Sequence, residues 1–450
     1  MKHDVFRSSV SMRVIMVIIL IGLVCVTATL DAQTKESYTL EDAIRLVLKN
    51  NPAIQEATDA QAVASARVAQ TRSGLYPQVR AEATYNRIGP APSLTIPELG
   101  TFQLFPHDNY DIHVAGRYML YDFRRIHEAV RLSETQAETV QDRLSTITRD
   151  LTYQTVQLFY MILFLQENIG VQHRYTQLLN EHLAMTRKKV ESGTATELDT
   201  LTTQVRVVNS QTRELDLQNT MDNQKVALRQ LMGLRPESDV SFTLNGDFRI
   251  DPSDRCIPDE TRQIDEALAK RVEMQAIRTA LKAAQTQVTL AGLSNKPAVG
   301  LNVMVGVKDG YVPNLNKPFL NFAAGIHIEA PVFDGYHSQY VKQEAAANIK
   351  VVEDRQKETE SGIRSEVSQA VNDVRANAKK LELVEMNIRQ SAKALEFARV
   401  KYKAGTATNL DLLDAEEAVS EAELVRVQVL SRYVLSCYAL KRAVGKKFND

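Results

Sequence analysis

A segment of this chain occurs twice, and the spacing between its two copies also separates a second pair of landmarks. The stretch Glu191–Asp199 (ESGTATELD) recurs as Lys403–Asp411 (KAGTATNLD). We call the difference in residue number between the two copies, from 191 to 403, the repeat offset. Asp122 in LYDF and Asp334 in VFDG are separated by the same repeat offset. Two independent landmarks with one offset indicate an internal duplication. Each half of the chain is therefore expected to fold into the same order of elements.

Residues 1–32 have the layout of a signal peptide. Basic residues precede an apolar run, Val14–Val26, and small residues follow it. The run is shorter than the ~20 residues that a membrane-spanning helix needs. We therefore predict export and cleavage near Ala32, with lipid attachment at Cys25 as an alternative.

The rest of the chain divides into two repeats and a connector. The first repeat is predicted at 33–232, a Pro-containing connector at 233–259 and the second repeat at 260–450. In each repeat the hydrophobic period predicts a helix, two strands, one very long helix, a tight turn and a returning helix. The first long helix, expected at about 124–191, carries an apolar stripe with the spacing of a coiled coil. At 1.5 Å per residue such a helix is a rod on the order of 100 Å long.

Local signals specify the turns at the ends of the two hairpins. Gly193 and Gly405 stand where the ascending helices end, as expected for a left-handed residue after a helix. Thr194 and Glu197 form a candidate capping box for the first returning helix. That returning helix also carries an apolar stripe at Leu198, Leu201, Val205 and Val208.

Four segments of about ten residues alternate with a period of two, which predicts strands with one apolar and one polar face. They lie near 78–86, 111–120, 299–307 and 320–329. The polar faces are predicted to line a wet lumen through six residues: Arg80, Glu82, His113, Arg117, His327 and Glu329. Ten residues tilted by about 45° span ~23 Å, close to the apolar band of outer-membrane barrels.

Four strands cannot close a barrel, because known single-chain barrels have at least about eight. An open edge in lipid would leave backbone groups without hydrogen bonds, so several copies are expected to share one barrel. The loops at 89–109 and 308–318 lie opposite the helices and are assigned to the cell exterior. The alternative is a pair of half-buried hairpins in a water-soluble protein.

The charge balance and the motifs of the chain argue against several other classes of protein. With 54 basic and 55 acidic side chains, the chain lacks the electrostatic footprint of a nucleic-acid-binding protein. Cys256 and Cys437 have neither metal-like nor redox-like spacing, although one bridge between them is possible. His127-Glu128 is followed by Arg131 where a zinc motif requires histidine. We therefore predict no catalytic residues, no metal site and no cofactor.

The sequence resembles the TolC family of outer membrane efflux proteins, or outer membrane factors, over nearly all of the mature chain. The resemblance rests on Tyr38–Ala43 leading to Asn51-Pro52, on Pro331–Gly335, and on the two tips with their Leu-Asp pair. It implies a mainly α fold with a membrane β-barrel portion, in which a homotrimer builds a shared 12-stranded barrel and a 12-helix periplasmic tunnel. The implied partners are a periplasmic adaptor and an inner-membrane transporter of RND, ABC or MFS type.

The resemblance also implies functional residues. The periplasmic entrance is expected at Asp199, Tyr402, Asp411 and Asp414, and adaptor contacts at the hairpin tips, Gly193, Thr194, Ala195, Gly405, Thr406 and Ala407. Asp411 and Asp414 could instead cap or solvate their helix. Ala407 stands where the best-known member has an arginine that pairs with the first-half aspartate, so closure is expected to be held differently here.

The function expected is a passive outer-membrane conduit for efflux or type I secretion, gated at the helical tips. The alternative is a periplasmic adaptor, which also has long α-hairpins. Adaptors usually show one hairpin within β domains, whereas here the entire pattern occurs twice. This difference favours the channel.

Overall fold

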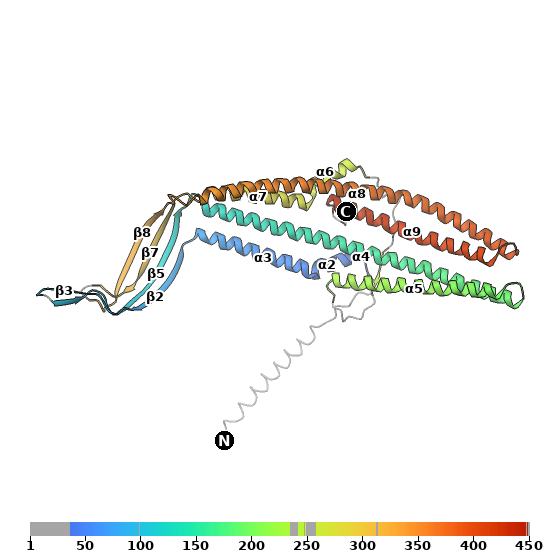
Figure 1. The fold of residues 1–450 in the computed structure, drawn as a ribbon, viewed down its shortest axis with the longest axis horizontal. Coiled ribbons are helices and arrows are strands. Elements are labelled where there is room, and N and C mark those ends of the chain that lie inside the picture. Colours follow the sequence, from blue (N-terminus) through green and yellow to red (C-terminus); the bar gives the residue numbers. More distant parts are fainter. Residues whose placement is uncertain are drawn as a thin grey trace, which may run out of the picture.

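The computed structural model describes residues 37–98, 100–234, 242–246, 248, 258–311, 314–446 and 448. The expected signal peptide at 1–32, most of the connector, and Cys256 with its possible bridge to Cys437 lie outside the described residues. The molecule is elongated, with a β-sheet at one end and the turns of two helical hairpins at the other (Figure 1).

Each half of the chain contains two shorter helices, strands of the sheet, one long helix and a returning helix, and the bounds of the two repeats stay a prediction. The first half contains β1 (Ser37–Tyr38), α2 (Leu40–Asn50), α3 (Pro52–Arg72), η1 (Ser73–Leu75), β2 (Gln78–Arg87), β3 (Ser93–Ile96), β4 (Gly100–Gln103), β5 (Asp108–Tyr121), α4 (Arg125–Glu191) and α5 (Glu197–Leu231). The second half contains β6 (Thr243–Leu244), α6 (Glu260–Lys270), α7 (Val272–Gly292), β7 (Ala298–Lys308), β8 (Phe319–Glu329), α8 (His337–Lys403) and α9 (Asn409–Val444). The long helices α4 and α8 are both 67 residues long.

Both hairpin tips have the predicted left-handed glycine. Gly193 has φ +72° and Gly405 has φ +74°. The amide after each glycine closes a Schellman turn, from Thr194 to the Lys189 carbonyl at 2.8 Å and from Thr406 to the Lys401 carbonyl at 2.9 Å. Each turn is therefore fixed by bonds inside its own hairpin.

The capping box predicted for Thr194 and Glu197 is wrong. The residue that caps α5 is Thr196, whose hydroxyl accepts the amide of Asp199 while the Asp199 carboxylate accepts the Thr196 amide. The shift arises because the Thr194 amide and hydroxyl both bond back to the carbonyl of Lys189. Since Thr194 completes the preceding turn, the next helix begins later.

The four long helices form a layer in the order α5, α4, α9, α8 (Figure 1). The hairpins α4/α5 and α8/α9 meet where α4 packs on α9. Shorter helices cover the half nearer the sheet, with α3 on α4 and α7 on both α4 and α8. The largest core cluster lies where α2, α4, α5 and β6 meet, and it includes Val47, Phe159, Ile162, Leu228 and Met232.

A closed ring of charges joins the two repeats in the middle of the molecule. Its six members alternate in sign: Arg271, Glu273, Arg149, Asp150, Arg442 and Glu366. Arg271 and Arg149 both reach Glu273 at 2.7 Å. Arg149 and Asp150 come from the first repeat and the others from the second, so the ring fixes one repeat against the other.

The four predicted strands form one antiparallel sheet in the order β2-β5-β7-β8. Within the described residues, the outer edges of β2 and β8 have no partner strand. The loop at 89–109 contains an additional hairpin, β3 paired with β4, that projects beyond the sheet (Figure 1).

Among the residues that the structure describes, no helix combines the length and apolarity needed to cross a membrane.

Candidate functional site

The first candidate site is the polar face of the sheet. The strand register pairs Glu82 with His113, and it pairs Gly300 with His327. Directly paired residues lie on the same face of a sheet. The same register places all six predicted lumen residues on one face, as the alternation predicted: Arg80, Glu82, His113, Arg117, His327 and Glu329. Their role in lining a lumen remains a prediction.

Charged side chains on this face form a ladder across β2, β5 and β7. The imidazole of His113 lies 3.3 Å from Glu82 through Nε2 and 2.8 Å from Asp111 through Nδ1. Arg80 pairs with Glu82 at 2.5 Å, and Lys308 pairs with Asp111 at 3.3 Å. The ladder contains both signs, so it does not form a single-sign field across the sheet.

Two glycines make room for the histidines on this face. A Cβ at Gly300 would overlap with the His327 ring, and one at Gly306 would overlap with the His113 Cβ. Each glycine is the direct cross-strand partner of its histidine. The polar face therefore requires the smallest residue opposite each imidazole.

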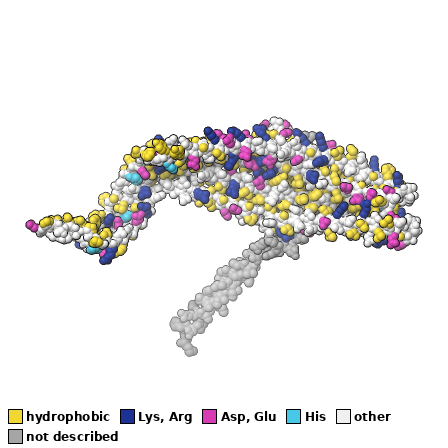
Figure 2. Space-filling view, viewed as in Figure 1, with side chains coloured by type: hydrophobic (Ala, Val, Ile, Leu, Met, Phe, Trp, Pro, Cys, Tyr) yellow, Lys and Arg dark blue, Asp and Glu magenta, His cyan; other side chains and the backbone are white. Residues whose placement is uncertain are grey.

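The opposite face of the sheet is apolar and exposed. Leu320 and Phe322 are 78% and 80% exposed. They continue a surface formed by Val79, Ile112, Val114, Val305, Ile326 and Ile328. Figure 2 shows hydrophobic side chains at this end of the molecule and at its junction with the helices. An apolar surface of this kind marks an interface with a membrane or another protein.

Aromatic side chains stand at both ends of the apolar face. Tyr85 and Tyr110 pack at 5.1 Å near the outer loops. Tyr121 packs on Phe123 at 4.9 Å where β5 meets α4, and Phe333 packs on Tyr336 between β8 and α8. Aromatic belts that flank an apolar band are typical of both membrane interfaces.

The second candidate site is the end of the molecule that carries the hairpin turns. Gly193, Thr194, Gly405 and Thr406 are exposed, whereas Ala195 and Ala407 are half-buried. Ala407 packs against a small cluster around Tyr402 and Leu412. Position 407 therefore supplies apolar packing.

The predicted acidic residues of the entrance are engaged within the chain. The Asp411 carboxylate accepts the Thr408 amide at 2.8 Å and the Thr408 hydroxyl at 2.7 Å, which caps α9. These bonds lower the pKa of Asp411, because they stabilise its charged form. Asp414 accepts a hydrogen bond from Arg206 at 2.7 Å, and Arg206 also pairs with Glu417. Arg206 was not predicted, because no pattern along the chain shows that α5 and α9 approach each other there.

Tyr402 is buried in a polar cluster that the sequence reasoning missed. Its ring packs on His182 with centroids 5.8 Å apart, and the Lys189 ammonium lies 3.6 Å from its centre. The Tyr402 hydroxyl is 3.5 Å from Asn409 Oδ1, and Asn409 Nδ2 donates to the Asp199 carbonyl at 3.4 Å. The structure therefore brings Tyr402 and Asp199 together through Asn409.

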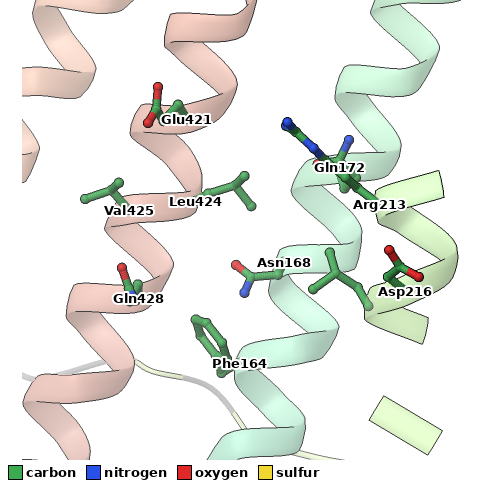
Figure 3. Close-up of a pocket in the computed structure, with 10 residues that line it drawn as sticks. Phe164, Asn168, Gln172, Arg213, Asp216, Glu421, Leu424, Val425 and Gln428 are labelled. Atoms are coloured by element: carbon green, nitrogen blue, oxygen red, sulfur yellow. The ribbon is translucent and has the colours of Figure 1, made fainter. Parts of the chain in front are cut away.

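A groove of about 410 Å³ lies further from the tips, between α4, α5 and α9 (Figure 3). Phe164 and Leu424 line it together with the charged Arg213 and Glu421. Asn168 on α4 extends toward α9, and its Oδ1 has no hydrogen-bond partner among the described residues. Within those residues, no three His, Cys, Asp or Glu side chains come close enough to hold a metal ion.

Comparison with known proteins shows the family. The sequence profile described as "Outer membrane efflux protein" matches residues 43–234 and 263–446. The chain belongs to this family. Members of the outer membrane efflux protein family are channels, and this chain is accordingly an outer-membrane channel subunit with helices in the periplasm. Family membership favours the channel over the adaptor alternative.

Individual members of the outer membrane efflux protein family match along most of their length. The alkaline protease secretion protein AprF of Pseudomonas aeruginosa is 26% identical over 85% of this chain and 79% of its own. The outer membrane protein TolC of Vibrio cholerae is 20% identical over 88% of each chain. The structure of the outer membrane protein VceC from Vibrio cholerae, at 20% identity, covers 91% of this chain and 96% of its own with a TM-score of 0.75. The fold is TolC-like, as the sequence predicted.

Proposed function

We propose that three copies of this chain form a continuous passive conduit from the periplasm to the exterior. Each copy would contribute four strands to a 12-stranded barrel and four long helices to a 12-helix tunnel. The unpaired edges of β2 and β8 support this arrangement, because lipid provides no hydrogen bonds for an open edge. The polar face with its charge ladder would line the lumen, and the apolar face would meet the lipid.

The observation that carries the proposal is a pair of matching apolar stripes on the two edges of the helical layer. On α5 the exposed stripe includes Leu198, Leu201, Val205, Val208 and Leu215. On α8 it includes Leu383, Met386, Phe397 and Val400. The α5 stripe has the three-four spacing of a coiled-coil seam, and the two α8 pairs, Leu383 with Met386 and Phe397 with Val400, are 14 residues, or two heptads, apart.

The two stripes also lie at the same level. Leu198 and Val400 are each five residues from the tip glycine of their hairpin, and Leu201 and Phe397 are each eight residues from it. A rotation axis along the tunnel keeps every residue at its level, so α5 of one copy would meet α8 of the next with the stripes in register. Closed rotational symmetry of this kind is the usual arrangement of homo-oligomers.

We propose that the conduit serves a tripartite efflux pump or a type I secretion system and has no catalytic activity. A periplasmic adaptor would bind the exposed tips at Gly193 and Gly405 and connect them to an inner-membrane transporter. The loops at 89–109 and 308–318 would face the exterior. AprF, whose name describes protease secretion, supports a secretion system, and the family description supports efflux.

Cysteine cross-linking tests the proposal. With Cys256 and Cys437 replaced by Ala, the pair Leu201→Cys and Phe397→Cys should yield covalent trimers with a short bismaleimide. The control combines Leu201→Cys with Leu383→Cys, which lies on the same stripe but about 21 Å further along α8. The control should not form trimers.

The same protein should behave as a membrane channel. We expect it to require detergent after extraction from outer membranes and to conduct ions in a planar lipid bilayer. A monodisperse monomer that is soluble without detergent, or cross-linking as efficient in the control as in the matched pair, would contradict the proposal.

A further inference from the structure

The groove between α4, α5 and α9 has the composition of a site for a small organic molecule. Its apolar walls come from all three helices: Phe164, Leu217, Leu424 and Val425. Its volume of about 410 Å³ falls within the ~300–1,000 Å³ that is usual for sites of small ligands. Exposed polar side chains form the rim of the groove: Arg213, Asp216, Glu421 and Gln428. Apolar walls with a few polar groups are typical of sites that bind and orient such molecules.

A buried acceptor in this groove lacks a donor. Asn168 is 6% exposed, and its Oδ1 has no hydrogen-bond partner among the described residues. Figure 3 shows the side chain extending from α4 toward Leu424 of α9. Gln172, one turn further along α4, is engaged instead, because its Nε2 donates to the Ser210 hydroxyl at 2.6 Å. Buried polar groups nearly always have a partner, so Asn168 Oδ1 points to a ligand that donates an N–H or O–H.

The rim of the groove carries an excess of negative charge. Asp216 and Glu421 are acidic and Arg213 is basic, and within the part of the chain that the structure describes none of the three forms an ion pair. A cation complements this rim better than an anion does. A protonated amine is a cation and an N–H donor at once, and the apolar walls favour an amine that carries an apolar group.

The groove lies on the side toward which the helical layer bends. α5 and α9 flank α4 in the layer, yet they also touch each other, where Arg206 binds Asp414 and Glu417. Two helices that meet over the helix between them make the layer concave on that side. Arg213 follows Arg206 by two helical turns, and Glu421 follows Glu417 by about one turn, so the groove lies on the same side. In a wall that closes into a tunnel, the concave side faces the lumen.

We propose that this groove binds protonated amines that carry an apolar group, with one site in each chain, on the lumen side of the conduit. This inference rests on the proposed trimeric conduit. Asn168 Oδ1 would accept an N–H of the ligand, the apolar group would pack on Phe164 and Leu424, and Glu421 would balance the positive charge. Rotational symmetry would place the three grooves at one level of the tunnel. An amine in transit would therefore be retained at the wall for a time.

Equilibrium dialysis of tryptamine against the channel in lipid nanodiscs tests the ligand class, with binding to empty nanodiscs subtracted. We expect saturable binding of one tryptamine per chain. Indoleacetate has the same ring with a negative charge, and propylammonium has the same charge without the ring, so both should bind several-fold more weakly. Equal binding of tryptamine and indoleacetate, or of tryptamine and propylammonium, would overturn the proposed class.

Asn168→Leu should weaken tryptamine binding about tenfold, because it removes the acceptor and keeps a side chain of similar size. Asn168→Asp retains an acceptor and adds a negative charge, so it should strengthen binding. The matched control is Asn180→Leu on the same helix, where the exposed Asn180 side chain donates to the Thr176 carbonyl at 3.0 Å. Equal affinities of Asn168→Leu and Asn180→Leu would refute the role of Asn168.

Glu421→Gln should also weaken tryptamine binding. The matched control is Glu423→Gln, which removes the same charge from the same helix. Glu423 lies outside the groove and pairs with Arg174 of α4 at 2.9 Å. Equal losses in the two variants would show that the overall charge of the wall attracts the amine, and would overturn the site.

Single-channel conductance tests whether the groove faces the lumen. In protein with Cys256 and Cys437 replaced by Ala, a membrane-impermeant methanethiosulfonate reagent attached at Gln428→Cys should lower the conductance, and the same reagent at Glu423→Cys should not. Equal effects at the two positions would contradict the lumen side of the site. Normal conductance without saturable tryptamine binding would overturn this inference and leave the conduit intact, whereas a protein that conducts no ions would contradict the conduit itself.

Discussion

Replacing Arg271 by Met should destabilise the junction of the two repeats by about 3 kcal/mol. Arg271 is 5% exposed and forms a two-point contact with Glu273, from Nη2 at 2.7 Å and from Nε at 3.1 Å, and it also binds Glu366. Breaking a buried ion pair costs about 3–5 kcal/mol. We expect the lower end of that range, because Glu273 retains Arg149 and Glu366 retains Arg442. Methionine keeps the apolar stem of the side chain in place.

An exposed pair between α8 and α9 provides the control. Arg426 lies 3.0 Å from Glu385, with side chains 48% and 49% exposed. This contact is made through Nε alone, and solvent screens its charges. Arg426→Met should therefore cost only about 0–1 kcal/mol. Thermal unfolding followed by circular dichroism at 222 nm, at one scan rate and in one detergent, compares the two variants with the unmodified protein.

The dependence of stability on pH gives a second test of the Arg271 contact. Burial favours the neutral form of Glu273, but the two arginines outweigh that effect and lower its pKa strongly. A group with a lowered pKa stabilises the fold at neutral pH, and this contribution is lost as the pH falls through the folded-state pKa. In Arg271→Met that pKa rises, so acid should destabilise the variant at a higher pH. Equal losses for Arg271→Met and Arg426→Met, or identical acid profiles for Arg271→Met and the unmodified protein, would refute this reasoning.

The other predictions concern single positions. Gly405→Ala should lower the unfolding free energy by about 1 kcal/mol, because Gly405 has a positive φ. Gly362→Ala, at an open helical position of α8, should raise the unfolding free energy by about 0.5–1 kcal/mol. Thermal melting compares the two variants. Gly300→Ala should reduce the yield of heat-resistant oligomer on gels, and adding His327→Ala should restore it, since the three atoms nearest to the new methyl group belong to that ring. Burial opposes protonation of His182, but its hydrogen bonds to Glu416 and Asn409 outweigh this effect and raise its pKa. The stabilisation from its protonated form should therefore be lost as pH rises through that pKa, and thermal melting should show this loss in the unmodified protein but not in His182→Ala.

Sequence reasoning recovered the elements whose signals are local. The long helices follow from the spacing of apolar residues, and the tips follow from Gly193 and Gly405, which adopt the expected left-handed conformation. The strands follow from alternation, and their register placed Glu82 beside His113 on one face, as predicted. These features depend on neighbours in the sequence, so the pattern is sufficient to specify them.

Contacts between helices could not be predicted in the same way. Asn51 and Arg271 differ in chemistry, yet each directly follows an 11-residue helix. The Asn51 side chain donates to the Leu231 carbonyl at 2.9 Å, and the Arg271 side chain donates to the Ala443 carbonyl at 3.4 Å. Those two carbonyls are themselves separated by the repeat offset. Asn51 and Arg271 therefore occupy equivalent places in the two repeats although their residue types differ. This equivalence is visible only in the structure, where each side chain lies beside the end of its returning helix. The His182 and Arg206 contacts were missed for the same reason.

The position of Ala407 shows why a buried contact suits this entrance. An arginine there would form an ion pair at an exposed tip, and such pairs contribute about 0–1 kcal/mol and weaken in salt. His182 instead pairs with Glu416 below the tip, where both side chains are buried and water does not screen the charges. Asp411 is already engaged as a helix cap. Cohesion of the two hairpins therefore does not depend on the outermost tip residues, so the adaptor contact that we propose at the tips would not weaken it.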